Sequence, residues 1–169
     1  MEGKTVEESR TVMSQLMMPS DANPMGNVHG GTIMKLVDTA GGICATRHAC
    51  RPVVTIVMDT MTFLQPVFVG HLVTLEAQVN WVGHTSLEVG VKVTAENILD
   101  GSITHTSSAY LVYVALDGAG QPTAVRPLVP QTEEERRRWQ AAEARQERRL
   151  REKAAHEESR RPASQTSDA

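Results

Sequence analysis

An aspartate in the middle of an apolar segment is the first residue whose type and position suggest chemistry. Asp38 lies within Gly30–His48, where apolar residues recur at the spacing of an amphipathic helix. A half-buried acid in such a helix costs free energy unless it is paired or used. It could act as a general base that activates water or as a carboxylate nucleophile, and the sequence does not separate these roles. The structural alternative is an exposed carboxylate that pairs with Lys35.

The start of the same helix is rich in glycine. Gly30-Gly31 would present unpaired backbone N–H groups and let a carbonyl oxygen approach closely, or would only permit tight turning and packing. The preceding Pro19–Asn27 is typical of an irregular loop. It contains Asn23 and Asn27, which could act in a site, although asparagine is also a common turn former and helix cap. Gly41-Gly42 costs about 1 kcal/mol per residue in mid-helix, which indicates a close approach there.

The elements around this helix are predicted to be strands. The segment Thr11–Met18 is a short strand, and four longer ones follow the helix at Val53–Leu64, Leu72–Val82, Ser86–Ala95 and Ile103–Leu116. We therefore predict an α+β fold in which one long helix is wrapped by a curved antiparallel sheet of about five to six strands, with the four long strands in a meander.

Three segments divide the predicted chain. Residues 1–10 form a flexible N-terminus, residues 11–131 the folded domain, and residues 132–169 a charged tail that is helical and then disordered. The helical part of the tail is either a solvated extension or a segment that binds a partner or clasps an oligomer.

Composition limits the function classes. The chain is 40% hydrophobic with a formal net charge of -3, and its body has no basic stripe, which excludes nucleic acid as the main partner. Cys44 and Cys50 are expected to be buried thiols in a reducing compartment, and no cluster of Cys and His predicts a metal site. We expect a cytoplasmic location, because neither a signal-peptide region nor a membrane span is visible.

The segment Asp21–Ile33, with the sequence DANPMGNVHGGTI, resembles the cytosolic acyl-CoA thioesterases with the hot-dog fold when it is taken together with Asp38. The similarity continues through Met61–Gly70, Thr85–Val89 and Ala95–Leu99. It implies a hot-dog fold and the hydrolysis of fatty acyl-CoA to free fatty acid and CoA. It also implies that no metal or redox cofactor is needed, since CoA is part of the substrate.

The resemblance assigns roles to individual residues. It implies that Asp38 activates water and that Asn23 positions it. The residues implied to hold the oxyanion or the substrate are His29, Gly30, Gly31, Phe63, Thr85 and Ser86. Structural alternatives stay open for several of them: His29 could only stabilise its loop, Phe63 could belong to the core, and Thr85-Ser86 could be ordinary turn residues.

The resemblance further implies homodimers whose sheets join edge to edge, often assembled as a trimer of dimers. Tandem relatives take the functional Asn and Asp from different domains, so here Asn23 of one subunit would serve Asp38 of the other. Two alternative functions remain on the same fold. One is a non-catalytic acyl-CoA binding or sensing protein, and the other is a hydratase or dehydratase of fatty thioesters, for which His29 would be the candidate catalytic residue.

Overall fold

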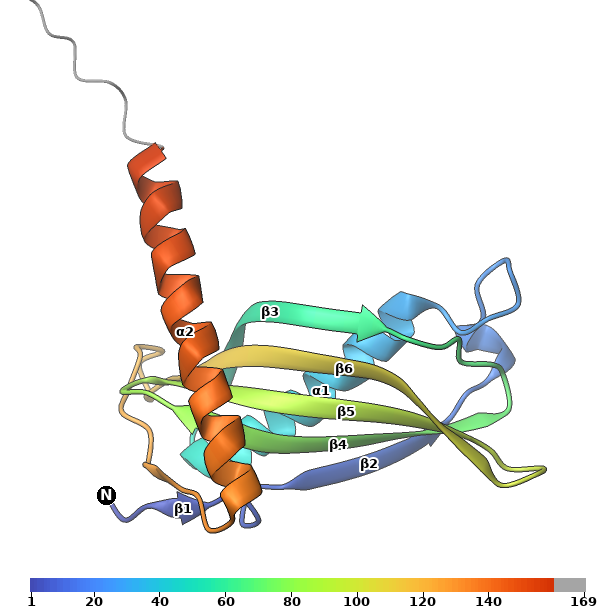
Figure 1. Cartoon of the computed structure of the whole chain (residues 1–169), viewed down its shortest axis with the longest axis horizontal. Coiled ribbons are helices and arrows are strands. Elements are labelled where there is room, and N and C mark those ends of the chain that lie inside the picture. The colour runs from blue at the N-terminus through green and yellow to red at the C-terminus, as the bar shows by residue number, and fades with distance from the viewer. Residues whose placement is uncertain (160–169) are drawn as a thin grey trace, which may run out of the picture.

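A computed structural model describes residues 1–159 and shows one long helix packed against an antiparallel sheet (Figure 1). The elements in chain order are β1 (Lys4–Thr5), β2 (Thr11–Leu16), η1 (Pro19–Asp21), α1 (Gly30–Ala49), β3 (Val53–Phe63), β4 (His71–Val82), β5 (Ser86–Asn97), β6 (Ser102–Ala115), β7 (Leu128–Val129) and α2 (Glu133–Ser159). The predicted α+β hot-dog architecture is confirmed, with five strands in the main sheet. In the described part of the chain, no helix is both long enough and apolar enough to cross a membrane.

The main sheet has the strand order β2-β4-β5-β6-β3, and every neighbouring pair is antiparallel. Strands β4, β5 and β6 form the predicted meander, but the prediction that β3 belongs to it is wrong. The connection explains the difference: α1 runs along one face of the sheet between β2 and β3 and delivers β3 to the opposite edge (Figure 1). Within residues 1–159, β3 therefore has one bonded neighbour, β6, and one open edge.

The core lies between α1 and the inner face of the sheet. Alternate strand residues such as Val73, Leu75 and Val79 are buried there, as the alternation predicts. The α1 residues packed against them include Ile33, Val37, Ala40 and Cys44. Burial raises the pKa of the Cys44 thiol to about 12, which keeps it protonated. The expectation of two buried thiols holds only for this residue, because Cys50 is exposed at the C-cap of α1.

The N-terminal residues are held in place, contrary to the expectation of a flexible segment over residues 1–10. Strand β1 pairs in parallel with β7, and Val6 and Ser9 are buried. The buried ring of His48 lies 3.3 Å from Ser9 Oγ through Nδ1 and 3.1 Å from the Arg126 carbonyl oxygen through Nε2. Burial lowers the pKa of His48, so the neutral ring links the N-terminal turn to the segment before β7.

Helix α2 crosses the outer face of the sheet and extends past the β3 edge (Figure 1). The helix predicted after residue 132 is present, but a solvated extension is wrong for the part up to Arg149. Ala142 is fully buried, and the side chains of Arg145 and Arg149 are largely covered. The predicted disorder at residues 162–169 lies outside the described residues.

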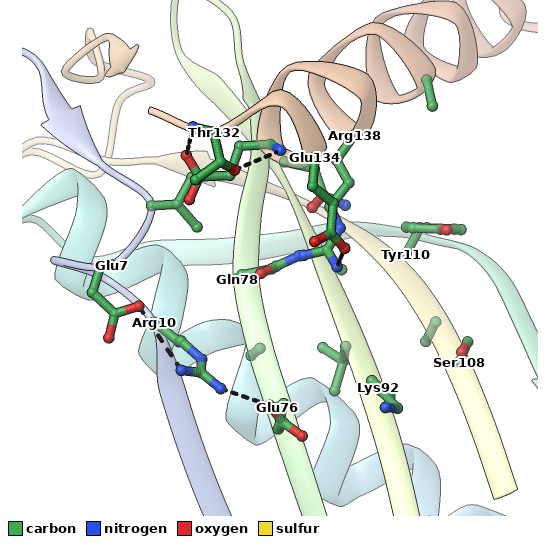
Figure 2. Close-up of a pocket in the computed structure, with 18 of the residues that line it drawn as sticks. Glu7, Arg10, Glu76, Gln78, Lys92, Ser108, Tyr110, Thr132, Glu134 and Arg138 are labelled. Atoms are coloured by element: carbon green, nitrogen blue, oxygen red, sulfur yellow. Dashed lines mark hydrogen bonds and ion pairs between the residues drawn. The ribbon is translucent and has the colours of Figure 1, made fainter. Parts of the chain in front are cut away.

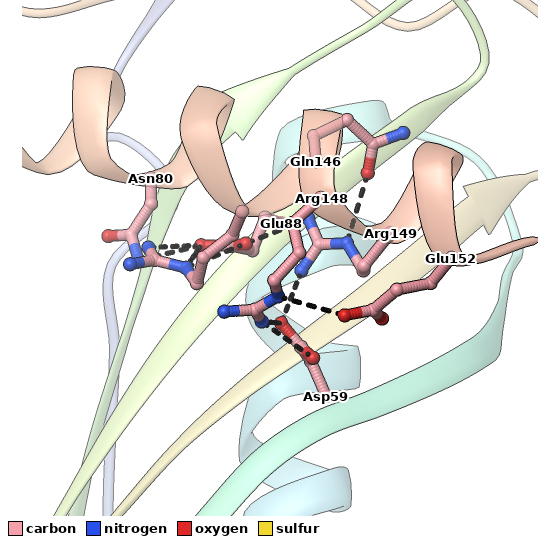
Figure 3. Close-up of polar contacts among 8 residues, drawn as sticks. Asp59, Asn80, Glu88, Gln146, Arg148, Arg149 and Glu152 are labelled. Atoms are coloured by element: carbon pink, nitrogen blue, oxygen red, sulfur yellow. Dashed lines mark hydrogen bonds and ion pairs between the residues drawn. The ribbon is translucent and has the colours of Figure 1, made fainter.

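Ion pairs fix α2 on the sheet (Figure 3). Arg145 and Arg149 converge on Glu88 of β5, with Nη2–Oε1 and Nη2–Oε2 distances of 2.6 and 2.9 Å, and the Glu88 side chain is 0% exposed. Arg148 and Arg149 also reach Asp59 of β3, at 3.0 and 2.9 Å. A carboxylate removed from water is tolerated only when its charge is compensated, so these arginines hold α2 in one position.

The buried pair predicts a large difference between two arginine substitutions. Arg145→Met leaves Glu88 with one arginine instead of two and should lower the free energy of unfolding by about 3 kcal/mol. Arg137→Met, which breaks an ion pair to Glu133 on the exposed side of α2, should change it by about 1 kcal/mol or less. Urea denaturation measures both values, and equal losses would contradict the role given to Glu88.

Candidate functional site

The loop before α1 is organised by the side chain of Asn23. Its Oδ1 accepts hydrogen bonds from the backbone N–H groups of Met25 and Asn27, at 2.9 and 3.3 Å. The backbone N–H of Asn23 donates to the Asn27 carbonyl oxygen. The turn-forming alternative for Asn23 is therefore real. These hydrogen bonds use only Oδ1. The Nδ2 amide of the half-buried Asn23 has no hydrogen-bond partner among residues 1–159, so the same side chain can still donate to a ligand.

His29 caps the start of α1, and Asn27 does not. The His29 Nδ1 atom accepts a hydrogen bond from the Gly31 N–H at 2.9 Å, while its backbone N–H donates to the Asp21 carbonyl oxygen. This contact shows a structural role for His29, which the sequence had left open. It also occupies the Gly31 N–H, so the Gly30 N–H is the donor at this helix start that has no acceptor among the described residues.

A cavity of about 310 Å³ opens beside this helix start. Gly30 and Phe63 lie next to each other in its lining, and a Cβ atom at position 30 would lie 3.5 Å from the Phe63 ring. Phe63 is 53% exposed and lines the cavity, so it is not a core residue in this chain. Asn23 and Asn27 line the same cavity, and the three predicted residues Asn23, Gly30 and Phe63 are thereby brought together.

Asp38 is held by hydroxyl groups and forms no ion pair within residues 1–159, so the predicted alternative of pairing with Lys35 is wrong. Its Oδ1 atom accepts a hydrogen bond from Thr55 Oγ1 on β3 at 2.7 Å. The Tyr113 hydroxyl on β6 lies 3.4 Å from the same oxygen and 3.1 Å from the Asp38 carbonyl oxygen. Neither Thr55 nor Tyr113 was predicted as a site residue, although the Gly41-Gly42 pair indicated a close approach to the helix.

One chain does not bring Asp38 to the cavity that contains Asn23. Asp38 is not among the residues lining that cavity, and it lies eight positions after Gly30 in the helix, a rise of roughly 12 Å. Thr55 and Phe63 lie eight residues apart on β3, roughly 25 Å along the strand. Each chain therefore carries two half-sites. The first contains Asn23, Gly30 and Phe63, and the second contains Asp38 and Thr55.

The predicted residues Thr85 and Ser86 lie at the second half-site's end of the sheet. Thr85 ends the turn between β4 and β5, and Ser86 is the first residue of β5. Ser86 pairs in register with Val114, which also pairs with Val54 on β3. The structure does not place them in the cavity with Asn23 and Phe63.

A larger cavity, of about 480 Å³, lies on the outer face of the sheet under the first turns of α2 (Figure 2). Several of its charged groups are paired with one another, as Arg10 is with Glu76 and Arg138 with Glu134. None of the predicted site residues lines it. Within the described residues, no group of three His, Cys, Asp or Glu side chains could hold a metal ion.

Comparisons with known proteins identify the family. The sequence model of the thioesterase superfamily matches residues 25–102. Protein VdlD of Helicobacter pylori is 41% identical over 147 residues, which are 87% of this chain and 84% of VdlD. The uncharacterized acyl-CoA thioester hydrolase YkhA of Bacillus subtilis is 39% identical over 134 residues, which are 79% of this chain and 78% of YkhA.

Solved structures of acyl-CoA thioesterases share the fold of this chain. An apo-hexameric acyl-CoA thioesterase has a TM-score of 0.87 at 38% identity and covers 91% of this chain and 99% of its own. Acyl-CoA hydrolase from Staphylococcus aureus, in complex with butyryl coenzyme A, coenzyme A and coenzyme A disulfide, has a TM-score of 0.85 at 29% identity, covering 92% and 95%. Variants of that hydrolase carry alanine in place of an Asn, an Asp and a Thr, whose spacing equals that of Asn23, Asp38 and Thr55 here.

The cap at the start of α1 can be tested by two substitutions. His29→Ala removes the acceptor of the Gly31 N–H and should lower the free energy of unfolding by about 1 kcal/mol, whereas His29→Asn keeps a polar cap and should recover most of it. Urea denaturation followed by circular dichroism measures both. Equal destabilisation would show that the ring packs the loop and that its cap bond contributes little.

Proposed function

The chain belongs to the thioesterase superfamily, and from this premise we propose that it is an enzyme that hydrolyses fatty acyl-CoA to free fatty acid and CoA. The observation that carries the proposal is the Asp38 carboxylate, which hydroxyl groups hold by Oδ1 while Oδ2 has no hydrogen-bond partner within residues 1–159. The names of YkhA and of the S. aureus hydrolase support acyl-CoA as the substrate class. CoA enters as part of the substrate, and the proposed chemistry uses no metal or redox cofactor.

The proposed reaction uses the two half-sites together. Asp38 Oδ2 takes a proton from water as the water oxygen attacks the thioester carbon, and the Gly30 N–H donates to the developing oxyanion. The C–S bond then breaks, and the proton passes from Asp38 to the CoA sulfur. The Asn23 amide orients the water or the thioester carbonyl. An attack by Asp38 itself, through a transient anhydride, would use the same groups.

Pairing of two chains along β3 would bring the half-sites together. The open edge of β3 carries exposed apolar side chains, including Val54 and Ile56, and an exposed apolar edge strand is a template for another strand. In an antiparallel pair centred near Asp59, Thr55 of one subunit lies opposite Phe63 of the partner subunit. Each of the two sites would then combine Asp38 of one subunit with Asn23 of the other.

The same pairing supports the proposed substrate contacts. Thr85 and Ser86 lie at the Thr55 end of the sheet, and in the dimer that end meets the partner's cavity beside Phe63 and Gly30. Their hydroxyl and backbone groups are suited to the CoA phosphates or pantetheine. We further propose that three such dimers assemble, which the hexameric thioesterase of similar structure supports.

Hydrolysis of a series from acetyl-CoA to palmitoyl-CoA tests the activity. The protein should release free thiol, and Asp38→Asn should lower kcat by about 100-fold or more, because it removes the general base and keeps the size of the side chain. Lys35→Ala, three residues away on the exposed side of α1, should leave kcat unchanged. Full activity of the Asp38 variant would reject its role. Binding without turnover would identify a sensing protein, and an enoyl thioester product a dehydratase.

Mixing two inactive variants tests the shared site. Asn23→Asp keeps a side-chain oxygen for the loop hydrogen bonds and loses the amide donor, so it separates the two roles of Asn23. Co-expressed in equal amounts with Asp38→Asn, it should restore about a quarter of wild-type activity, because half of the random dimers are mixed and each of these has one intact site. If both residues acted within one chain, the mixture would be as inactive as its components.

A further inference from the structure

We infer that Tyr113 is a positioning residue for Asp38, and that position 41 is glycine so that the tyrosine hydroxyl can reach the helix. The inference rests on the proposed role of Asp38. Tyr113 is a buried residue of β6, the strand next to the edge strand β3 that carries Thr55. We add it to the groups that determine the orientation of the Asp38 carboxylate.

The strand register places two hydroxyl groups side by side under Asp38. Thr55 of β3 and Tyr113 of β6 are directly paired across the two strands, so their side chains point to the same inner face of the sheet. Thr55 Oγ1 donates to Asp38 Oδ1 at 2.7 Å, and the Tyr113 hydroxyl lies 3.4 Å from the same atom. Both contacts engage one carboxylate oxygen, so the side-chain rotamer is fixed and Oδ2 is left for the reaction.

The Tyr113 hydroxyl also binds the helix backbone. It donates to the Asp38 carbonyl oxygen at 3.1 Å and shares its proton between this oxygen and Oδ1. Burial, and after it the nearby Asp38 charge, raises the pKa of Tyr113, so the phenol is protonated and acts as a donor at neutral pH. The tyrosine thus attaches both the main chain and the side chain of Asp38 to the sheet.

Gly41 makes this contact possible. A Cβ atom at position 41 would lie 3.2 Å from Tyr113 Cζ and would overlap the phenolic oxygen. At Gly42 the corresponding contact is an ordinary 3.8 Å, so the restriction falls on Gly41. Glycine in mid-helix weakens the helix, and its presence here is explained by the space that the hydroxyl needs.

The test compares the two tyrosines of the chain. Tyr113→Phe should lower kcat for acyl-CoA hydrolysis about 10-fold, the rate equivalent of losing a hydrogen bond to a charged group, with KM changed less than about 2-fold. Tyr110→Phe is the matched control, because Tyr110 lies on the outer face under Arg145 and should leave kcat unchanged. An unchanged kcat in Tyr113→Phe would overturn the inference.

A combination with Asp38→Asn separates positioning from a general structural role. In the Asp38→Asn background, Tyr113→Phe should cause no further loss of the residual rate. It should still lower Tm, because the hydrogen bond to the carbonyl oxygen of residue 38 is lost there too. A further 10-fold loss would overturn the inference and leave the proposed function intact. Full activity of Asp38→Asn alone would instead reject the proposed function, and the positioning role with it.

Gly41→Ala gives a second approach that keeps the hydroxyl group. The added methyl should displace the Tyr113 hydroxyl, lowering kcat as Tyr113→Phe does and lowering Tm. Adding Tyr113→Phe to Gly41→Ala should raise Tm above that of Gly41→Ala alone, because the overlapping oxygen is gone. Additive losses of Tm would show that the hydroxyl does not occupy the space over Gly41 and would overturn the inference.

Discussion

The fixed separation between Asn23 and Asp38 is the constraint on which the rest of the structure depends. α1 is one continuous helix of 20 residues, and its rise places Asp38 roughly 12 Å beyond Gly30. The separation along the helix is fixed, because α1 is packed along its length against the sheet. A single chain therefore separates the residues of the proposed site into two groups, and each group contains a residue of the open edge strand β3 or a residue bonded to it. The proposed dimer would join the two groups along this strand.

The outer face of the sheet explains how an open edge strand is kept in place. Glu88 lies on β5 and Asp59 on β3, and Arg149 bonds to both, so one side chain of α2 links two strands that are separated by β6. These ion pairs act on the outer face and leave the hydrogen-bonding groups of the edge free. An apolar helix could cover the same surface with a smaller desolvation cost. The buried charges instead fix where along the sheet the helix lies, and thus which strands it holds.

Local patterns predicted those features that depend on neighbours in sequence. Alternation identified the strands β4 and β5, and β-branched residues identified β3. Helical spacing identified α1 to within one residue of its observed end, and the Gly41-Gly42 pair indicated a close approach. What approaches was not predictable, because Tyr113 lies far along the chain and meets Gly41 only through the sheet register. The edge position of β3, the pairing of β1 with β7 and the docking of α2 were missed for the same reason, since each depends on contacts between segments distant in sequence. The roles proposed for Asn23 and Asp38 came from the family resemblance, and the structure adds to them the geometry of two half-sites.

The partners of Asp38 bear on how it could act. A carboxylate that has only a structural role can be stabilised by a cation, as Glu88 is by two arginines. Asp38 has instead two neutral hydroxyl donors, both of which contact Oδ1, although Lys35 is available one helical turn away. Neutral donors fix the direction of a carboxylate and leave its charge uncompensated, and they engage the oxygen that a reaction would not use. The two hydroxyl donors therefore favour a carboxylate that is held in one orientation with Oδ2 open to take a proton from water.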